Sequence, residues 1–209
     1  MALLHRAYLR PTKLELLTAW LPGRPWFAGD ATAAVERVSA CRFDDPDGAV
    51  GIETLLVRAG DGPILHAPLT YRGAPLPGGD AFLLGTTEHE VLGKRWVYDA
   101  CGDPVYAAAL AHAVLTGGGQ AEEYFEVDGR KEVREAAMTV TGSGAGDPAP
   151  GIGTLVRTVD GDPTTVVTDT VELAVARVVG AAPLPAGETL TGNWPGLAAP
   201  VLLASARLV

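Results

Sequence analysis

Hydrophobic positions near the start of the chain follow a helical spacing. Leucines recur at three- to four-residue intervals between Leu14 and Leu21, which is typical of one face of a helix. Thr12 stands three residues before Glu15, and this spacing matches a capping box. The pattern predicts a short helix from residue 13 to about residue 20.

Further along, apolar residues alternate with polar ones or run together over short stretches, as expected for strands. Asp-Gly pairs, which readily supply positive φ and favour hairpin turns, separate several of these stretches. The pairs begin at Asp47, Asp61, Asp128 and Asp160. The predicted strands are residues 35–43, 49–58, 64–70, 81–85, 95–98, 125–127, 131–141, 154–159, 164–179 and 201–208.

A second helix is predicted where Asp103 precedes Pro104, because Asp is a favoured N-cap and Pro fits the first helical position. Residues 117–119 are all Gly and should end this helix. Two helices among many hairpin-linked strands indicate an α+β fold with a mostly antiparallel sheet. The glycine-rich stretch 142–153 lacks the Lys of a phosphate-binding loop and is interpreted as a flexible loop or linker.

Composition narrows the class of protein. The 209 residues are 47% hydrophobic and 20% charged, so the chain can bury a core. The net charge of -9 disfavours partnership with nucleic acid or with an anionic membrane surface. No segment approaches the length of a membrane span, so we expect a cytoplasmic protein. Cys41 and Cys101 lie far apart without metal-ligand spacing, and we expect reduced thiols, no metal and no cofactor.

Residues 20–29 form the most distinctive segment. The sequence Trp-Leu-Pro-Gly-Arg-Pro-Trp-Phe-Ala-Gly places two Trp and one Phe among two Pro and two Gly. Pro restricts φ and Gly relaxes it, so this segment is predicted to be a shaped loop. Such a loop either plugs a core with its aromatic rings or docks a partner.

Residues 12–118 resemble the N-terminal cap domain of actinobacterial maltokinases and of related trehalose synthase–maltokinase fusions. The resemblance rests on the order and spacing of several short motifs. These are Trp20-Leu21-Pro22, Arg24-Pro25-Trp26-Phe27-Ala28-Gly29, His66-Ala67-Pro68-Leu69-Thr70-Tyr71-Arg72, Leu84-Gly85, Tyr98-Asp99-Ala100 and Asp103-Pro104. The resemblance implies a curved antiparallel sheet of cystatin-like arrangement. It also implies a cap-like domain over residues 1–119, followed by a β-rich region over residues 120–209 that packs on the same sheet or forms a small second module.

In maltokinases the cap precedes a two-lobed domain that binds ATP and phosphorylates maltose. Residues 120–209 contain no P-loop, no His-x-Asp-x-x-x-x-Asn catalytic loop and no downstream magnesium motif. Kinase activity is therefore not carried over by the resemblance. We expect a non-catalytic, cap-like binding or regulatory partner of an enzyme of trehalose, maltose or α-glucan metabolism, or a self-associating protein. The alternatives are an α-glucan-binding protein, an enzyme acting on α-glucans, and a regulator that displaces a maltokinase cap.

Sugars stack on aromatic rings and hydrogen-bond to planar polar groups. The candidate binding residues are Arg24, Trp26, His89, Arg95, Trp96 and Asp99. Whether they converge, or whether Trp26 only fills the core, is left open by the sequence. Glu88, His89 and Glu90 would alternate on a strand, which splits the trio and argues against a metal site. They are interpreted as part of a solvated loop.

Overall fold

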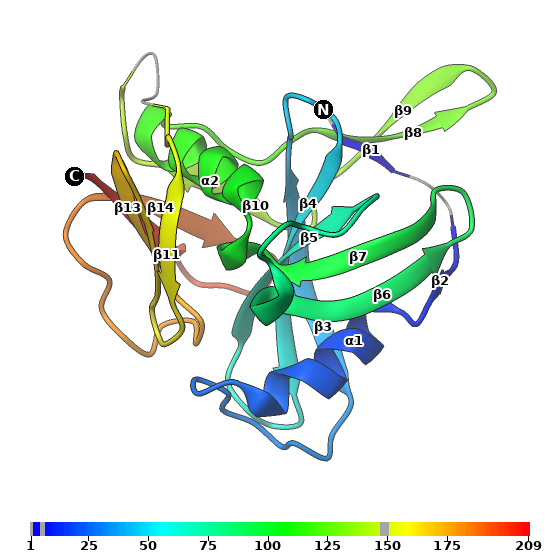
Figure 1. The fold of residues 1–209 in the computed structure, drawn as a ribbon, viewed down its shortest axis with the longest axis horizontal. Coiled ribbons are helices and arrows are strands. Elements are labelled where there is room, and N and C mark those ends of the chain that lie inside the picture. Colours follow the sequence, from blue (N-terminus) through cyan, green and yellow to red (C-terminus); the bar gives the residue numbers. More distant parts are fainter. Residues whose placement is uncertain (1, 5–6, 147–150) are drawn as a thin grey trace.

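The computed structural model describes residues 2–4, 7–146 and 151–209, and within these it places two α-helices among three sheets (Figure 1). The first sheet is antiparallel and curled, with strand order β2-β6-β7-β5-β4-β3. Its strands are β2 (Leu9–Arg10), β3 (Val35–Phe43), β4 (Val50–Ala59), β5 (Leu65–Arg72), β6 (Leu83–His89) and β7 (Gly93–Asp99). All six of its strands precede residue 100 in the chain.

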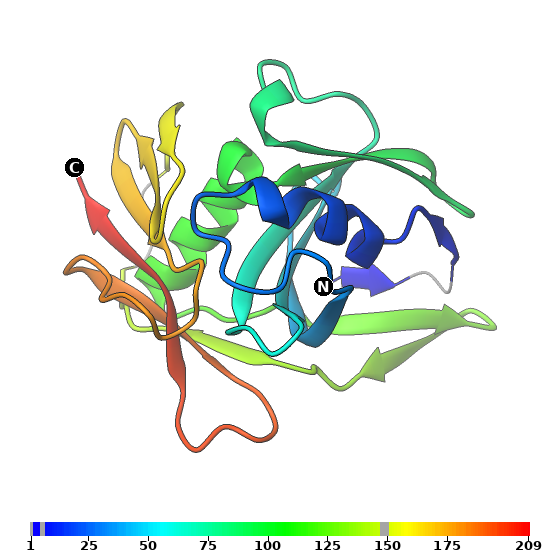
Figure 2. The ribbon, with the colours of Figure 1, turned by 90° about the horizontal axis from the view of Figure 1, so that it is seen from below.

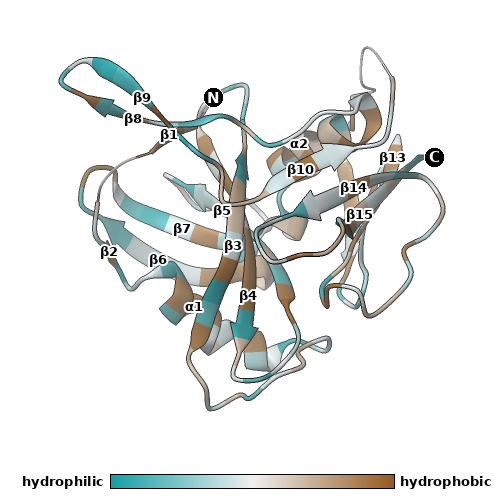
Figure 3. Cartoon of the chain, turned by 180° about the vertical axis from the view of Figure 1, so that it is seen from behind, coloured by the Kyte–Doolittle hydropathy of each residue, from teal (hydrophilic) through white to brown (hydrophobic). Residues whose placement is uncertain are grey.

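The second sheet is also antiparallel and follows the order β10-β14-β15-β13-β12-β11. Its strands are β10 (Thr139–Gly142), β11 (Leu155–Val159), β12 (Thr164–Thr168), β13 (Val171–Val175), β14 (Glu188–Asn193) and β15 (Val201–Leu208). A small third sheet pairs β1 (Ala2–Leu4) in parallel with β8 (Glu123–Val127), which pairs in turn with β9 (Arg130–Arg134). Figure 3 shows the β8–β9 hairpin projecting from the body of the molecule.

The first helix, α1 (Lys13–Trp20), has the predicted bounds and the predicted cap. The Glu15 N–H donates to Thr12 Oγ1 at 3.2 Å, and the Thr12 N–H donates to Glu15 Oε2 at 2.7 Å. This reciprocal pair satisfies backbone donors that the first helical turn leaves open. Leu17 is fully buried against one face of the first sheet, which α1 crosses in Figure 2.

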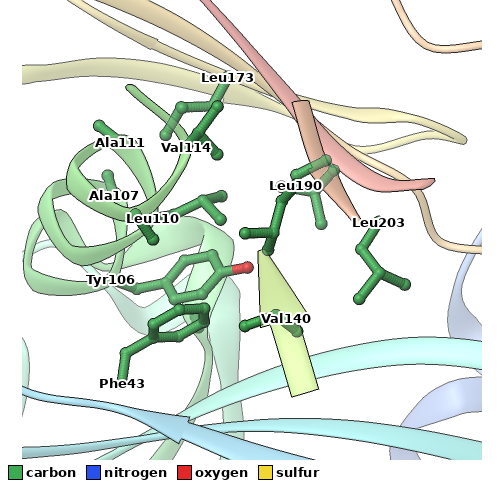
Figure 4. Close-up of a cluster of buried hydrophobic side chains, with 14 of the residues drawn as sticks. Phe43, Tyr106, Ala107, Leu110, Ala111, Val114, Val140, Leu173, Leu190 and Leu203 are labelled. Atoms are coloured by element: carbon green, nitrogen blue, oxygen red, sulfur yellow. The ribbon is translucent and has the colours of Figure 1, made fainter. Parts of the chain in front are cut away.

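The second helix, α2 (Pro104–Thr116), lies between the first and second sheets. Asp103 caps its start, and Gly117 ends it with a left-handed φ of 70°, as predicted. Figure 4 shows Leu110 and Val114 of this helix facing Leu190 of β14. One buried cluster joins α2 to both sheets, from Phe43 on β3 to Leu203 on β15. The two sheets therefore share a continuous hydrophobic core.

The α+β, mostly antiparallel class is confirmed, while several details differ from the prediction. The predicted strand 131–141 is two strands in different sheets, and the predicted strand 164–179 is the hairpin of β12 and β13. Strand β14 was not predicted, and β6 extends through His89, so Glu88 and His89 lie on a strand and not in a loop. Strands β10 to β15 form a sheet of their own.

The interpretation of residues 142–153 as a flexible linker is wrong for its first part. The Gly144 N–H donates to Val114 O at 2.9 Å, and the Gly146 N–H donates to Leu115 O at 2.8 Å. A Cβ on Gly142 or Gly144 would overlap backbone atoms of α2, so glycine permits this close approach. Pro148 and Pro150 of the same stretch lie outside the described residues.

The division of the chain into residues 1–119 and residues 120–209 stays a prediction. Helix α2 precedes that boundary in sequence but packs on β10, β14 and β15, which follow it. None of the described helices is long and apolar enough to cross a membrane.

Candidate functional site

A cavity of about 500 Å³ opens on the α1 face of the first sheet, beyond the N-terminal end of the helix. Its floor comes from neighbouring strands of the sheet, and β1 and the segment before α1 contribute apolar side chains to its walls. The lining polar and charged residues are Lys13, Arg42, Asp44, Asp45, Tyr71, His89 and Arg95. The lining leucines are Leu3, Leu4, Leu9 and Leu92. Pockets of this size hold small ligands in other proteins.

A buried carboxylate lies beside this cavity. Glu53, in the middle of β4, is 4% exposed and accepts two bonds from Lys13 Nζ, at 2.7 and 2.5 Å. The Tyr71 hydroxyl donates to Glu53 Oε2 at 2.8 Å, and Arg42 Nη2 lies 3.6 Å from the same oxygen. Two cations therefore share one carboxylate, which leaves the cluster with one excess positive charge.

Burial and neighbouring charges shift the pKa of Glu53 in opposite directions. Burial alone would raise the pKa of this carboxyl group, but Lys13 and Arg42 outweigh it and lower the pKa to about 2. Burial lowers the pKa of the Lys13 ammonium, the Glu53 carboxylate raises it, and the net effect is a lowered pKa. Burial and the same carboxylate raise the pKa of Tyr71 well above its usual value. Glu53 is thus held ionised while Tyr71 stays a hydrogen-bond donor.

Arg95 and His89 occupy another wall of the cavity, on β7 and β6. Arg95 Nη2 donates to Leu92 O at 2.9 Å, while its Nε is buried without an acceptor among the described residues. A Cβ on Gly73 would lie 2.7 Å from Arg95 Nη1, so the absent side chain makes room for the guanidinium. His89 Nδ1 accepts N–H bonds from Val91 and Leu92, each at 3.2 Å, so a neutral His89 carries its hydrogen on Nε2.

A second polar cluster lies elsewhere, where the two large sheets meet. Arg177, which follows β13, is fully buried, and its Nη2 donates to Asp99 Oδ2 at 2.6 Å. Its guanidinium lies 4.8 Å from the centre of the Trp26 ring, and Trp26 Nε1 donates to Asp160 Oδ1 at 2.6 Å. Burial opposes ionisation of Arg177, but Asp99 outweighs burial and raises the pKa of the guanidinium. This cluster ties the first sheet to the second.

The six candidate residues predicted from the sequence do not converge. Trp26 and Asp99 belong to the buried junction around Arg177, and Arg24 stands at its edge, with Nη1 3.6 Å from Asp160 Oδ2. His89 and Arg95 line the cavity. Trp96 is half-buried beneath Lys94, whose Nζ lies 5.1 Å from its ring centre. Neither Trp26 nor Trp96 is among the described residues that line the cavity with Arg95.

The residues that sequence reasoning missed are charged side chains within apolar stretches. Glu53 interrupts the buried strand β4, and Arg177 interrupts a run of Val and Ala. Buried charges need partners, so each interruption is a signal that a partner exists. The partners themselves are remote in sequence, because Lys13 is 40 residues from Glu53 and Asp99 is 78 residues from Arg177. No group of three or more potential metal ligands gathers within the described ranges.

Comparison with known proteins places a family match on the first half of the chain. The family model of the maltokinase N-terminal cap domain matches residues 20–103, which confirms the resemblance over that part. No curated protein matches this chain.

Two solved structures of glucosamine kinase are similar to the chain as a whole. One is a complex with glucosamine, ADP and inorganic phosphate, with 17% identity and a TM-score of 0.48. The other is crystal form A, with 18% identity and a TM-score of 0.46. Each match covers 95% of this chain and 41% of the kinase chain, so this chain spans about two fifths of the length of those proteins.

Proposed function

We propose that the chain acts by binding, because residues 20–103 match the family model of the maltokinase N-terminal cap domain. In this proposal it is a non-catalytic or regulatory partner of an enzyme of trehalose, maltose or α-glucan metabolism. A cytoplasmic location and a cystatin-like arrangement of the cap belong to the same proposal.

The observation that carries the proposal is the match of residues 20–103 to the cap-domain family model. Residues 120–209 supply the second sheet, which shares a core with the cap strands through α2. A cap held by a continuous core presents a pre-organised surface, and pre-organisation lowers the entropic cost of association.

The test is direct binding between purified proteins. The chain would be titrated by calorimetry against the maltokinase, the trehalose synthase and the α-glucan enzymes of the cell it comes from. An unrelated protein of similar acidity serves as the control, since the chain carries a net charge of -9. Saturable binding to one of these enzymes, absent with the control, is expected. If all of them fail to bind, the partner role is wrong.

Two further measurements separate the other forms of this proposal. Adding the chain to a maltokinase assay tests competition with the cap of that enzyme, which would lower the rate in proportion to occupancy. Light scattering on the purified chain tests self-association. A single monomeric mass at all concentrations would exclude self-association.

Binding of an α-glucan is the second candidate function, and the cavity is the observation that favours it. Tyr71, His89 and Arg95 offer a ring and planar polar groups to a sugar. No tryptophan is among the described lining residues, so titration calorimetry with maltose is a better assay than tryptophan fluorescence. Heat of binding that disappears in Tyr71→Phe or Arg95→Gln would support this function, and the absence of heat would exclude it.

A further inference from the structure

We propose that the cavity beside α1 binds a small organic anion, with its carboxylate or phosphate group at Arg95 and its partly apolar body against the leucines. This inference goes beyond the partner role above and does not depend on it. It rests on the guanidinium of Arg95 on β7, on the balance of charge across the floor, and on the leucines of the lining.

The first step concerns the guanidinium of Arg95. Within the described ranges it makes no ion pair, and its only protein acceptor is the Leu92 carbonyl. Its Nε is buried and has no acceptor in the described part of the chain, and leaving a buried donor unsatisfied is costly. Carboxylates and phosphates match the donor geometry of an arginine, so either group would satisfy this guanidinium.

The second step concerns Gly73, which directly follows β5, the strand that pairs with β7. Any larger residue would place a Cβ 2.7 Å from Arg95 Nη1. Glycine therefore keeps space open beside the charged group.

The third step concerns the acidic residues that also line the cavity. Asp44 and Asp45 follow β3, while Arg95 is on β7, and β4 and β5 separate these strands in the sheet. At the usual strand spacing they are separated by roughly 14 Å measured along the curled sheet. Asp45 also accepts backbone N–H bonds from its own turn, from Asp47, Ala49 and Val50. The acidic end is thus distant from Arg95, and Asp45 is locally compensated.

Between these ends, Lys13 and Arg42 share the single carboxylate of Glu53, so the middle of the floor has one excess positive charge. Leu3, Leu9 and Leu92 add apolar side chains to the lining of the cavity. A charged head at Arg95 with an apolar body beneath these leucines satisfies both features. Inorganic phosphate has no apolar body, so it would make no such contact with the leucines.

The experiment is titration calorimetry on the intact chain with four probes: hexanoate, its uncharged isostere hexanamide, phenyl phosphate and inorganic phosphate. Saturable binding is expected for hexanoate, for phenyl phosphate or for both, but not for hexanamide. Hexanoate alone would identify a carboxylate ligand, and phenyl phosphate alone would identify a phosphate ester. Affinity should fall as salt concentration rises.

Arg95→Gln should weaken binding about tenfold or more, since a charge-assisted hydrogen bond is lost. Arg58→Gln is the matched control, because Arg58 is an exposed arginine on β4 outside the cavity. This variant should bind the probes with the affinity of the wild type. Gly73→Ala keeps the charge of Arg95 but displaces the guanidinium, so it should also weaken binding. This variant serves as the test if Arg95→Gln fails to fold. The proposal is overturned if no probe binds saturably, if inorganic phosphate alone binds, or if both variants bind like the wild type.

Discussion

The buried ion pair between Asp99 and Arg177 gives the sharpest prediction about stability. In Asp99→Asn the amide keeps the size of the carboxyl group and can still accept the Cys101 N–H that Asp99 Oδ1 accepts at 3.3 Å. What is lost is the negative charge 2.6 Å from Arg177 Nη2. Arg177 would then remain fully buried with only the Thr164 hydroxyl and the Trp26 ring as described partners.

An uncompensated buried charge of this kind costs about 3–5 kcal/mol. That loss is a large fraction of the roughly 5–15 kcal/mol by which a typical domain is stable. The assay is urea unfolding at neutral pH, with the free energy of unfolding extrapolated to water. Because Asp99 is on the first sheet and Arg177 follows β13 of the second, the loss should appear as one shifted cooperative transition.

The matched control is Glu172→Gln, which breaks the pair with Arg207 on the exposed face of the second sheet. That change should cost less than about 1 kcal/mol. The double variant Asp99→Asn with Arg177→Met should recover part of the loss, since it removes the unpaired charge. A cost for Asp99→Asn no greater than that of Glu172→Gln would refute the reasoning.

Three further predictions concern pH, a glycine and the first helix. Burial lowers the pKa of His66 to about 3, so the free energy of unfolding should fall by up to about 1.4 kcal/mol per pH unit below pH 6.5. His66→Gln should flatten that slope in acid titrations, and exposed His112→Gln should not. Gly142→Ala should cost about 1–3 kcal/mol in urea unfolding by overlap with Ala113 O, whereas Gly151→Ala, with open space around it, should be nearly neutral. Thr12→Ala should cost about 1 kcal/mol by the same assay, as loss of an N-cap does, and Thr12→Ser should restore it.

The pH prediction has a definite sign. The folded-state pKa of His66 lies below its unfolded value, so the neutral ring stabilises the fold above pH 6.5, and this is lost as the pH falls toward about 3. The pKa of Glu53 is also depressed, to about 2, so its contribution is present above its usual value near 4.5 and is lost below it. The His66 effect therefore appears first on acidification, and a profile that stays flat between pH 6.5 and 5 would contradict it.

Local signals in the sequence were enough to predict both helices. The capping box at Thr12 and the Asp103-Pro104 start are satisfied within a few residues, so no remote partner is needed to recognise them. Strand β14 shows the opposite case. Its sequence Glu-Thr-Leu-Thr-Gly-Asn has little apolar character, and it is held by pairing with β10 and β15.

The candidate site was predicted only in part, for a related reason. Arg95 and His89 were identified as polar residues near aromatic ones, but the cavity also depends on Lys13, Arg42 and Tyr71 from three other elements. Trp26 was identified as either a core residue or a binding residue, and its partners decide that it is buried beside Arg177. Such partnerships are set by the tertiary fold, which local spacing does not encode.

The most direct test of the proposed partner role is native co-purification followed by reconstitution. The tagged chain would be recovered from the cell it comes from, and each co-eluting enzyme would then be purified and titrated against the chain. We predict one enzyme of trehalose, maltose or α-glucan metabolism that co-elutes at a fixed ratio and binds saturably when pure. Recovery of the chain alone, or only with enzymes outside that metabolism, would contradict the account.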